Sequence, residues 1–257
     1  IITAVYILFT IYRLKHEVVV EQHMTDMKLR FFTDISHELR TPLTLISGPV
    51  EYVLEHTQLP ADAREQLQVV ERNTNRMLRL INQILDFRKI QNKKMKMQVQ
   101  RVNVVAFTRK IMENFDSVAE EHHIDFLFET EKPELYLWVD VDKYEKIIFN
   151  LLSNAFKYTP NGKMIKVFIH EDEETVSIGV QDQGIGIAEN KKKSIFVRFE
   201  NLVDRNLFNP STGIGLSLVK ELVEMHKALI TVDSKLGEGS CFKIDFMKGK
   251  EQYDESV

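Results

Sequence analysis

The segment Ser36-His37-Glu38-Leu39-Arg40-Thr41-Pro42-Leu43 begins a long part of the 257-residue chain that has no strand-like alternation. At about 100° per residue on a helix, His37 lies about 200° from both Ile35 and Leu39. The histidine therefore points away from the apolar stripe, on a polar face that it shares with Thr41. An isolated histidine on a solvated face is usually only an exposed side chain, so its surroundings must decide its role.

Apolar residues recur at helical spacing on both sides of His56-Thr57-Gln58-Leu59-Pro60, which is typical of a hairpin loop. The repeating positions are Ile35, Leu39, Leu43, Ile46, Val50 and Val53, then Leu67, Val70, Thr74, Met77, Ile81 and Ile84. The second set alternates steps of three and four, which is the repeat of bundle packing. Residues 15–97 are therefore predicted to form two long antiparallel helices. Because two helices cannot enclose a core, we expect a homodimeric four-helix bundle.

The two ends of the chain differ from its body. The apolar run Ile1–Tyr12 is followed by Arg13 and Lys15. This run is shorter than the ~20 residues that cross a bilayer. Residues 1–14 are thus predicted to be the end of a transmembrane helix that leaves on the cytoplasmic side, the alternative being a buried helix or a signal-peptide core. Residues 249–257 are polar and are predicted to be a flexible tail.

Composition excludes some functions. The formal net charge of -4 argues against a nucleic-acid partner, which usually needs a basic surface. The single cysteine, Cys241, excludes an internal disulfide and cysteine-based metal sites.

After Met97 the pattern changes to mixed helices and antiparallel strands, which predicts an α+β domain over residues 98–248. The predicted helices are Val104–His122, Asp142–Tyr158 and Gly213–Met225. The predicted strands are Ile124–Glu129, Leu135–Trp138, Met164–His170, Thr175–Val180, Leu229–Ser234 and Ser240–Phe246, the last four forming two hairpins. The stretch Gln183–Thr212 has no period, which is typical of a functional lid or of disorder.

One helix of this domain carries a polar stripe. Its members are Asn150, Asn154, Lys157 and Tyr158. Spacings of four, seven and eight residues place them on one face. Carboxamide oxygens and an ammonium suit Mg²⁺ and a triphosphate, although the same residues can form a plain solvated face.

Two glycine-containing motifs follow. Asp182-Gln183-Gly184-Ile185-Gly186-Ile187 comes after a strand, and its glycines allow close approach of the backbone. Ser211-Thr212-Gly213-Ile214-Gly215-Leu216 opens a helix, where N–H groups and the helix dipole favour phosphate. Each motif alone is weak, because a helix cap with packing glycines has the same appearance.

Taken together, these motifs resemble those of a known family. Ser36–Leu43 closely resembles the phosphoacceptor box of the sensor histidine kinases of two-component systems, and the three later motifs resemble the N, G1 and G2 boxes of their ATP-binding domain. Ile195–Phe199 resembles the F box, and Gly237–Ser240 resembles the turn that closes the domain. The resemblance covers about residues 25–247. It implies a fold of class α + (α+β): a HisKA-type helical hairpin forming a dimeric four-helix bundle, then a GHKL-type α/β-sandwich with a mixed, largely antiparallel sheet.

The resemblance also implies an activity. The chain would be an ATP-dependent protein-histidine kinase that autophosphorylates His37 and passes the phosphoryl group to an aspartate in the receiver domain of a response regulator. Glu38, beside His37, would hold or accept the imidazole proton, and Thr41 would orient water in a phosphatase reaction on the regulator. The implied ATP-binding residues are Asn150, Asn154, Lys157, Tyr158, Asp182, Gly184, Gly186, Arg198, Thr212, Gly213, Gly215 and Leu216, with Asn154 ligating Mg²⁺ and Asp182 accepting from adenine.

Two other functions stay open. The first is a hydrolytic ATPase of the same superfamily, whose members carry a glutamate base where this chain has Asn150. The second is a catalytically inactive scaffold, which is disfavoured because the motif residues are present. Gln183 and Ser211 depart from the family pattern without removing a group that the chemistry needs. The resemblance further implies a bacterial inner-membrane protein with this region in the cytoplasm, similar to the hybrid two-component sensors of Bacteroidetes.

Overall fold

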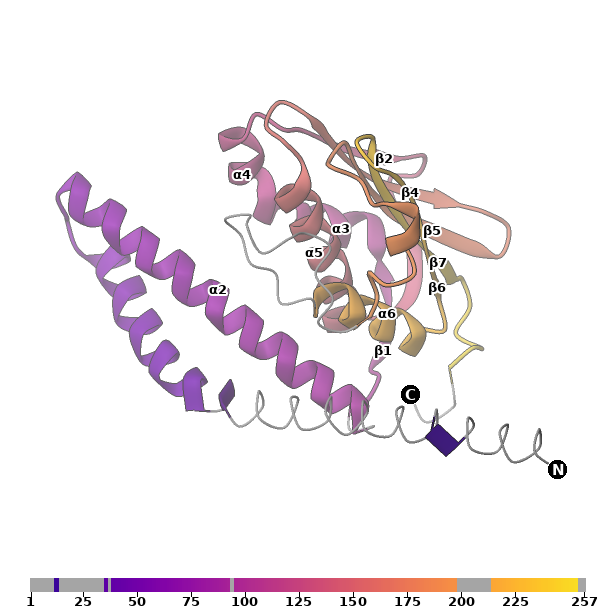
Figure 1. The fold of residues 1–257 in the computed structure, drawn as a ribbon, viewed down its shortest axis with the longest axis horizontal. Helices are drawn as coiled ribbons and strands as arrows, with labels where there is room; N and C mark the ends of the chain where they lie inside the picture. Colours follow the sequence, from indigo (N-terminus) through magenta and orange to yellow (C-terminus); the bar gives the residue numbers. More distant parts are fainter. Residues whose placement is uncertain (1–11, 14–34, 37, 93–94, 198–213, 254–257) are drawn as a thin grey trace. The chain divides into compact units, whose positions relative to one another are not determined.

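The structure is a computed structural model that describes residues 12–13, 35–36, 38–92, 95–197 and 214–253. The chain divides into two compact units, Ile1–Met95 and Lys96–Val257. The first unit is helical, and the second combines a sheet with helices (Figure 1). Among the described residues, no helix has both the length and the apolar character to cross a bilayer. Residues 1–11 of the expected membrane segment lie outside the described residues.

The first unit contains a helix over residues 38–56 and α2 (Ala61–Gln91), joined by the loop 57–60. Arg40 donates from its guanidinium to Asn82 Oδ1 at 2.7 Å, and Ser47 Oγ donates to Asn75 Oδ1 at 3.3 Å. From Arg40 to Ser47 the residue number rises on the first helix, while it falls from Asn82 to Asn75 on α2. The two helices are therefore antiparallel. The predicted helical hairpin is confirmed.

The apolar stripe of this hairpin is only partly covered within one chain. Ile81 and Leu85 of α2 are buried, at 5% and 7% exposed. Leu39, Ile46 and Met77, which belong to the same predicted stripe, are 47%, 45% and 52% exposed. The hairpin therefore leaves a row of large apolar side chains without cover in the described chain.

The second unit holds the remaining elements (Figure 1). Its helices are α3 (Val104–Met112), η1 (Glu113–Phe115), α4 (Asp116–Glu121), α5 (Val141–Tyr158), η2 (Glu189–Lys191) and α6 (Gly215–Met225). Its strands are β1 (Val99–Asn103), β2 (Asp125–Thr130), β3 (Tyr136–Asp140), β4 (Met164–Glu171), β5 (Thr175–Asp182), β6 (Leu229–Lys235) and β7 (Gly239–Met247).

Five strands form one sheet in the order β2-β4-β5-β7-β6. β2 pairs with β4 in parallel, whereas the other neighbours pair antiparallel. β1 and β3 form a separate antiparallel pair. The predicted mixed, largely antiparallel sheet and both predicted hairpins are thus confirmed.

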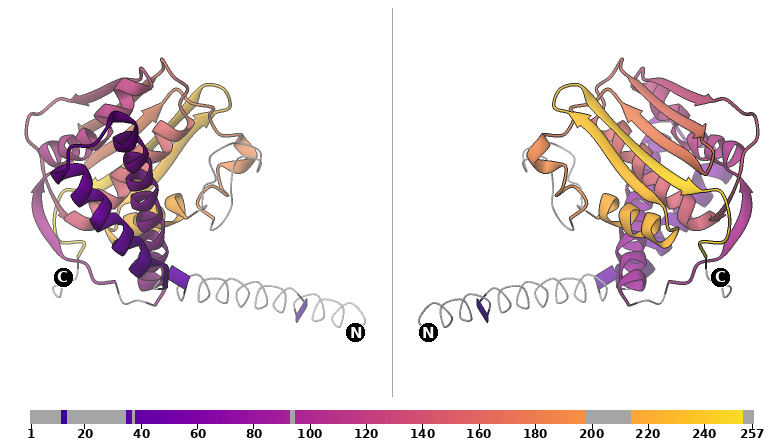
Figure 2. Two further views of the ribbon diagram at one scale, coloured as in Figure 1. Left: turned by 90° about the vertical axis from the view of Figure 1, so that its left-hand side faces the viewer. Right: turned by 90° about the vertical axis from the view of Figure 1, so that its right-hand side faces the viewer.

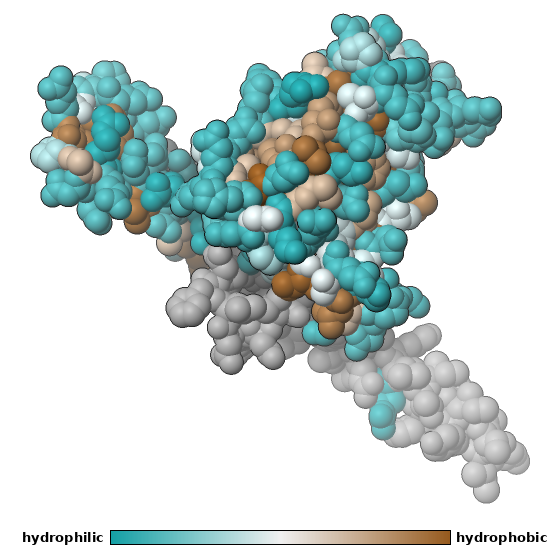
Figure 3. All heavy atoms as spheres, turned by 90° about the horizontal axis from the view of Figure 1, so that it is seen from above, coloured by the Kyte–Doolittle hydropathy of each residue, from teal (hydrophilic) through white to brown (hydrophobic). Residues whose placement is uncertain are grey.

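The core of this unit lies between the sheet and its helices, which cover one face of it (Figure 2). Alternate residues of β4 are buried, as period-two geometry requires when one face is covered. The facing helix α5 buries Ile147, Ile148 and Leu151 almost completely. On the face shown in Figure 3, hydrophilic residues dominate the surface of the second unit and surround a hydrophobic area, as is common for globular domains.

Two details of the second unit differ from the predictions. The expected single helix Val104–His122 is broken into α3 and α4 by η1. At the break, the ring of Phe115 packs against those of Phe149 and Phe156, with centroids 4.9 and 5.2 Å apart. The strand β1 was not expected, because its residues have no clear alternation.

The C-terminal segment is not wholly free of contacts. Tyr253, in the segment expected to be a flexible tail, donates its hydroxyl to the Trp138 carbonyl of β3 at 3.0 Å. Lys250 lies over the Trp138 ring, 5.4 Å from its centroid. Burial raises the pKa of the Tyr253 hydroxyl. The described part of this segment therefore packs on β3.

Candidate active site

The end of α5 meets the turn that follows β5. A Cβ atom on Gly184 would lie 2.5 Å from the Tyr158 carbonyl oxygen and 2.7 Å from Asp182 Oδ1. Ile185 N donates to the same Tyr158 carbonyl at 3.2 Å. Glycine at position 184 thus lets the polar stripe of α5 and the carboxylate of Asp182 come together.

Asp182 is the last residue of β5 and is 8% exposed. Its Oδ1 accepts from Gly184 N at 2.8 Å. Burial raises the pKa of this carboxyl, while hydrogen bonds from the backbone of Gly184 and Ser240 act in the opposite direction. Asp182 is therefore a fixed, poorly solvated acceptor, which is the kind of group that reads a donor on a ligand.

The turn after β5 also closes onto the turn between β6 and β7. Gly186 has φ +66°, and a Cβ there would lie 2.0 Å from the Lys235 carbonyl oxygen. Gly237 N donates to the Ile185 carbonyl at 2.7 Å. Gly239 has φ +101°, and its Cβ would lie 2.0 Å from the Asp182 carbonyl oxygen. Two turns that are distant in the sequence are therefore held together without side chains between them.

Replacing Gly186 with alanine is expected to destabilise the second unit by more than the conformational cost alone. Gly162 offers a matched control, because it has φ +73° but no atom within 4 Å of its added Cβ. Gly162→Ala should cost ~1–2 kcal/mol, the penalty for an L-residue in the left-handed region. Gly186→Ala should cost at least ~1 kcal/mol more, because the turn must also open. Urea unfolding of the two variants measures the difference, and equal losses would show that the two turns are not locked together.

The stripe on α5 approaches the start of α6. Asn150 is 7% exposed and donates from Nδ2 to the Lys146 carbonyl at 2.6 Å. A Cβ on Gly215 would lie 3.1 Å from Asn150 Oδ1. Asn154 is half-buried one turn further along α5. The metal-ligand candidate and the first turn of α6 therefore belong to one region of the unit.

The remaining predicted residues of the stripe and of α6 lie in the same elements. Lys157 Nζ lies 5.3 Å from the centroid of the Tyr158 ring, and both side chains are half-buried. Gly215 and Leu216 are the first residues of α6, whose N-terminus has no side-chain cap from Ile214. Helix amides and the helix dipole at such an end favour an anion. The predicted residues Arg198, Thr212 and Gly213 lie outside the described residues.

Thr159 is a candidate site residue that the sequence did not indicate. It follows α5 directly, and its hydroxyl is buried with no hydrogen-bond partner among the described residues. The carbonyl of the preceding residue, Tyr158, is the one that meets Gly184. A buried hydroxyl without a partner is costly, so a ligand atom or an ordered water would be stabilised beside it. A threonine after a helix is too common to be noticed as a functional signal.

In the first unit, two of the predicted catalytic residues can be placed. Glu38 and Thr41 are both exposed on the helix 38–56. Three residues apart, they are neighbours on the helix surface. Arg40 points instead to α2, where it is bonded to Asn82. The third predicted residue, His37, lies outside the described residues.

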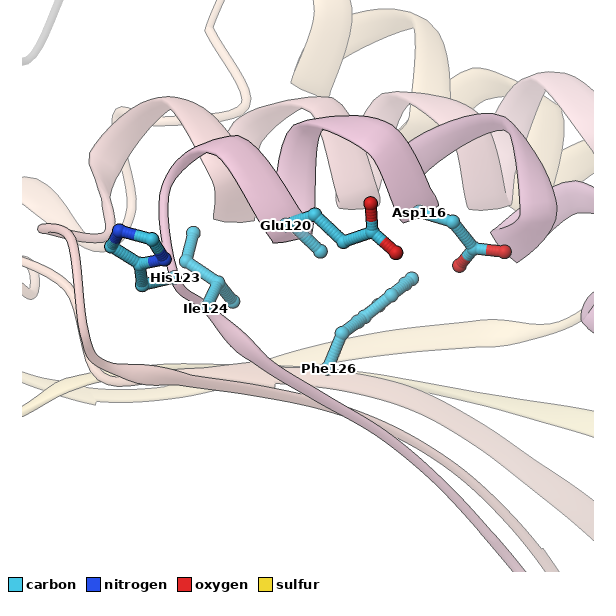
Figure 4. Close-up of a pocket in the computed structure, with 6 residues that line it drawn as sticks. Asp116, Glu120, His123, Ile124 and Phe126 are labelled. Atoms are coloured by element: carbon cyan, nitrogen blue, oxygen red, sulfur yellow. The ribbon is translucent and has the colours of Figure 1, made fainter.

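A surface pocket of the second unit lies between α4 and the start of β2 (Figure 4). Asp116 and Glu120 come from the helix and Phe126 from the strand. None of the residues predicted to bind ATP lines this pocket. Among the described residues there is also no cluster of three or more His, Cys, Asp or Glu side chains that could hold a metal ion.

Two family models match the chain. Residues 27–93 match the His Kinase A (phospho-acceptor) domain, and residues 139–250 match the histidine kinase-, DNA gyrase B- and HSP90-like ATPase.

Curated proteins give the same assignment. Histidine kinase P4 of Formosa agariphila is 36% identical over 95% of this chain and 19% of the relative. Sensor histidine kinase TmoS of Ectopseudomonas mendocina is 39% identical over 86% of this chain and 23% of the relative. Sensor histidine kinase WalK of Bacillus subtilis is 33% identical over 92% of this chain and 39% of the relative. The chain thus spans well under half the length of these relatives.

Solved structures share the fold. Full-length ShkA in complex with AMPPNP aligns with a TM-score of 0.67 at 24% identity, covering 85% of this chain and 46% of that one. Histidine kinase ThkA in complex with the response regulator TrrA aligns with a TM-score of 0.59 at 22% identity, covering 86% of this chain and 61% of that one. The fold of the described units is therefore one that known proteins adopt.

Proposed function

The chain belongs to the histidine kinases, because it carries both parts of their core, and on this premise we propose that ATP held by the second unit phosphorylates His37 of the first. The observation that supports ATP most strongly is the convergence on Asp182. The end of α5, the turn after β5 and the β6–β7 turn meet there only because glycines occupy the contact positions. The buried Asp182 carboxylate and the unpartnered Thr159 hydroxyl then give a purine amine or its bridging water something to bond.

The residues of α5 and α6 suit the rest of the nucleotide. Asn154 offers a neutral oxygen to Mg²⁺, an ion that keeps most of its water and takes few protein ligands when phosphates supply the others. Lys157 offers a cation to phosphate, and the first turn of α6 at Gly215 and Leu216 offers backbone amides. We assign the same role to Arg198, Thr212 and Gly213 on sequence grounds.

ATP supplies the phosphoryl group. In the proposed reaction, one ring nitrogen of His37 forms a bond to the γ-phosphorus. The bond from that phosphorus to the bridging oxygen breaks, and ADP leaves with its electrons. Glu38 takes or holds the proton on the other ring nitrogen, which keeps the attacking nitrogen unprotonated. The phosphoryl group then passes to an aspartate of a response regulator, which frees His37. In the separate phosphatase reaction, Thr41, exposed near Glu38, aligns the water that attacks the aspartyl phosphate and releases inorganic phosphate.

The alternative of a hydrolytic ATPase is disfavoured by Asn150. Its carboxamide already donates to the Lys146 carbonyl and faces Gly215. A carboxamide cannot take a proton from water as a glutamate can. Incubation with γ-labelled ATP distinguishes the functions: acid-labile label on the protein indicates a kinase, free phosphate indicates an ATPase, and neither product indicates a scaffold.

We further propose a homodimer, a response-regulator partner and a membrane attachment that places this region in the bacterial cytoplasm. The dimer is supported by the exposed row of Leu39, Ile46 and Met77 in the hairpin. A monomer would leave this apolar face in water, which stable soluble proteins rarely do.

Light scattering is expected to give twice the chain mass, and Ile46→Asp should shift the chain towards monomer by placing a charge in the interface. Glu55→Ala is the control, since Glu55 lies nine residues on, about 180° around the helix. A monomeric wild-type chain at micromolar concentration would contradict the proposed dimer, and an Ile46→Asp variant that remains dimeric would place the interface elsewhere.

A further inference from the structure

His226 is completely buried at the end of α6, although the proposed reaction does not use it. Its Nδ1 lies 2.7 Å from the Leu222 carbonyl oxygen, and its Nε2 lies 3.1 Å from the backbone nitrogen of Asp140. A carbonyl can only accept and a backbone amide can only donate. The ring is therefore neutral, with the proton on Nδ1 and a lone pair on Nε2. It also lies edge-on to Phe246 of β7, with centroids 5.7 Å apart.

The amide that His226 holds belongs to the residue that caps α5. Asp140 Oδ1 accepts from Lys143 N at 3.1 Å. Its Oδ2 accepts from Lys143 Nζ at 2.6 Å and from Gln98 N at 2.7 Å. The carboxylate is thus fully engaged in starting α5 and in fixing the chain before β1. His226 therefore joins the last turn of α6 to Asp140, the residue at which α5 starts.

The two helices touch again where α6 begins, beside the middle of α5. Gly215, the first residue of α6, approaches Asn150 Oδ1 of α5. Asp140 and Asn150 are ten residues apart on α5, and Gly215 and His226 are eleven apart on α6, so both intervals span about 15 Å along a helix. α5 and α6 therefore run antiparallel. They are joined at two contacts, His226 with Asp140 and Gly215 with Asn150, whose spacing is similar along both helices.

We propose that His226 is a positioning residue for ATP binding: by fastening the far end of α6 to α5, it keeps the glycine end of α6 opposite Asn150 and Asn154. The role rests on the proposed ATP site. Gly215 has no side chain to fix the first turn of α6 beside Asn150. The orientation of its phosphate-facing amides is therefore set by buried side chains further along α6, such as Leu218, together with the far contact of His226. His226 does not touch the nucleotide in this role.

The contact is expected to weaken in acid. Burial lowers the pKa of His226, and the neighbouring Lys143 adds to this effect, while the carboxylate of Asp140 opposes it. Phe246 and the Leu222 carbonyl, the other groups against the ring, do not titrate. Because the folded pKa lies below the ordinary value, the contact is complete above about pH 6.5 and is lost as the pH falls through the lowered pKa. Protonation would place an N–H on Nε2 against the N–H of Asp140.

Two substitutions at position 226 distinguish the effects of the two hydrogen bonds that the His226 ring makes. In His226→Asn, the carboxamide reaches the position of Nδ1 but leaves the Asp140 amide without an acceptor. In His226→Gln, the longer side chain brings an oxygen to the position of Nε2. Calorimetry of the 257-residue chain with Mg²⁺–AMPPNP should give about tenfold weaker binding for His226→Asn and a change within about twofold for His226→Gln. Transfer of phosphate from already phosphorylated His37 to a regulator should not change.

The pH profile adds a readout that a purely structural role would not move. As the pH is lowered from about 7.5 through the lowered pKa of His226, to the most acid pH at which the chain stays folded, wild type should lose AMPPNP affinity more steeply than His226→Gln, whose amide does not titrate. Parallel profiles, wild-type affinity in His226→Asn, or equal weakening in both variants would overturn the proposal. If His226→Asn does not fold, the comparison of wild type with His226→Gln still decides it. A wild-type chain that binds no AMPPNP at any pH would instead refute the proposed ATP site.

Discussion

Replacing His37 with glutamine is expected to abolish autophosphorylation while ATP binding stays unchanged. A carboxamide is not a nucleophile, so the γ-phosphoryl group has no acceptor on the helix. The groups assigned to the nucleotide, such as Asp182 and Asn154, belong to the other unit. The measurement is acid-labile label from γ-labelled ATP, together with the AMPPNP affinity of the same preparation. Retained label at wild-type level would show that another residue is phosphorylated.

The neighbours of His37 should behave differently from it. Glu38→Gln keeps the imidazole but removes the proton acceptor, and losses of a general base are typically ~10²–10⁴-fold in rate. Thr41→Ala should leave autophosphorylation nearly unchanged and slow dephosphorylation of the regulator, because the hydroxyl only orients water.

Thr44→Ala is the matched control, since the Thr44 hydroxyl is occupied by the Arg40 carbonyl at 2.9 Å. The assignment of roles fails if Glu38→Gln is silent, or if Thr41→Ala blocks autophosphorylation as His37→Gln does.

Sequence periodicity predicted those elements whose pattern and caps lie within their own residues. In the hairpin of β4 and β5, every second residue from Ile165 to Ile169 and from Val176 to Val180 is a buried β-branched residue, so these side chains share one face wherever the hairpin is placed. The helix α5 carries its own cap, because Asp140 accepts from Lys143 N. Such features are visible without knowing the rest of the fold.

The elements that were missed depend on distant partners. β1 becomes a strand because it pairs with β3, from Val99 opposite Asp140 to Asn103 opposite Tyr136. No glycine or proline marks the break between α3 and α4, where Phe115 turns to stack on Phe156 of α5. The parallel pairing of β2 with β4 likewise has no local signal.

The candidate site shows the same division. The motifs identified the glycines, but the reason that Gly184 and Gly186 cannot carry a side chain is given by carbonyls of Tyr158 and Lys235. His226 was one histidine among eight in the sequence, and only its burial and its contact with Asp140 distinguish it. Motif spacing therefore identifies the residues that we propose to contact the ligand. The residues that support the site are identified only from the three-dimensional structure.

Replacing Asp182 with asparagine is expected to change which purine the site accepts. The carboxylate has two acceptor oxygens, and it accepts from Gly184 N at 2.8 Å and from the backbone of Ser240. Asparagine has a single oxygen, so keeping the turn intact leaves its NH₂ group facing the 6-amino group of adenine. Two donors then oppose each other in a poorly solvated place, and ATP affinity should fall by about 10–100-fold.

A nucleotide with an acceptor at the same position provides the matched test. Inosine triphosphate carries a 6-oxo group, which the NH₂ of asparagine can donate to, whereas the wild-type carboxylate repels it. Calorimetry should therefore show that Asp182→Asn prefers inosine triphosphate over ATP, the reverse of wild type, while its urea unfolding stays close to that of wild type. Because burial raises the pKa of Asp182, wild-type ATP affinity should also begin to fall at a higher pH than an ordinary aspartate would give. Equal loss of both nucleotides would mean that Asp182 supports the turn only, and unchanged ATP affinity would mean that adenine is read by other groups.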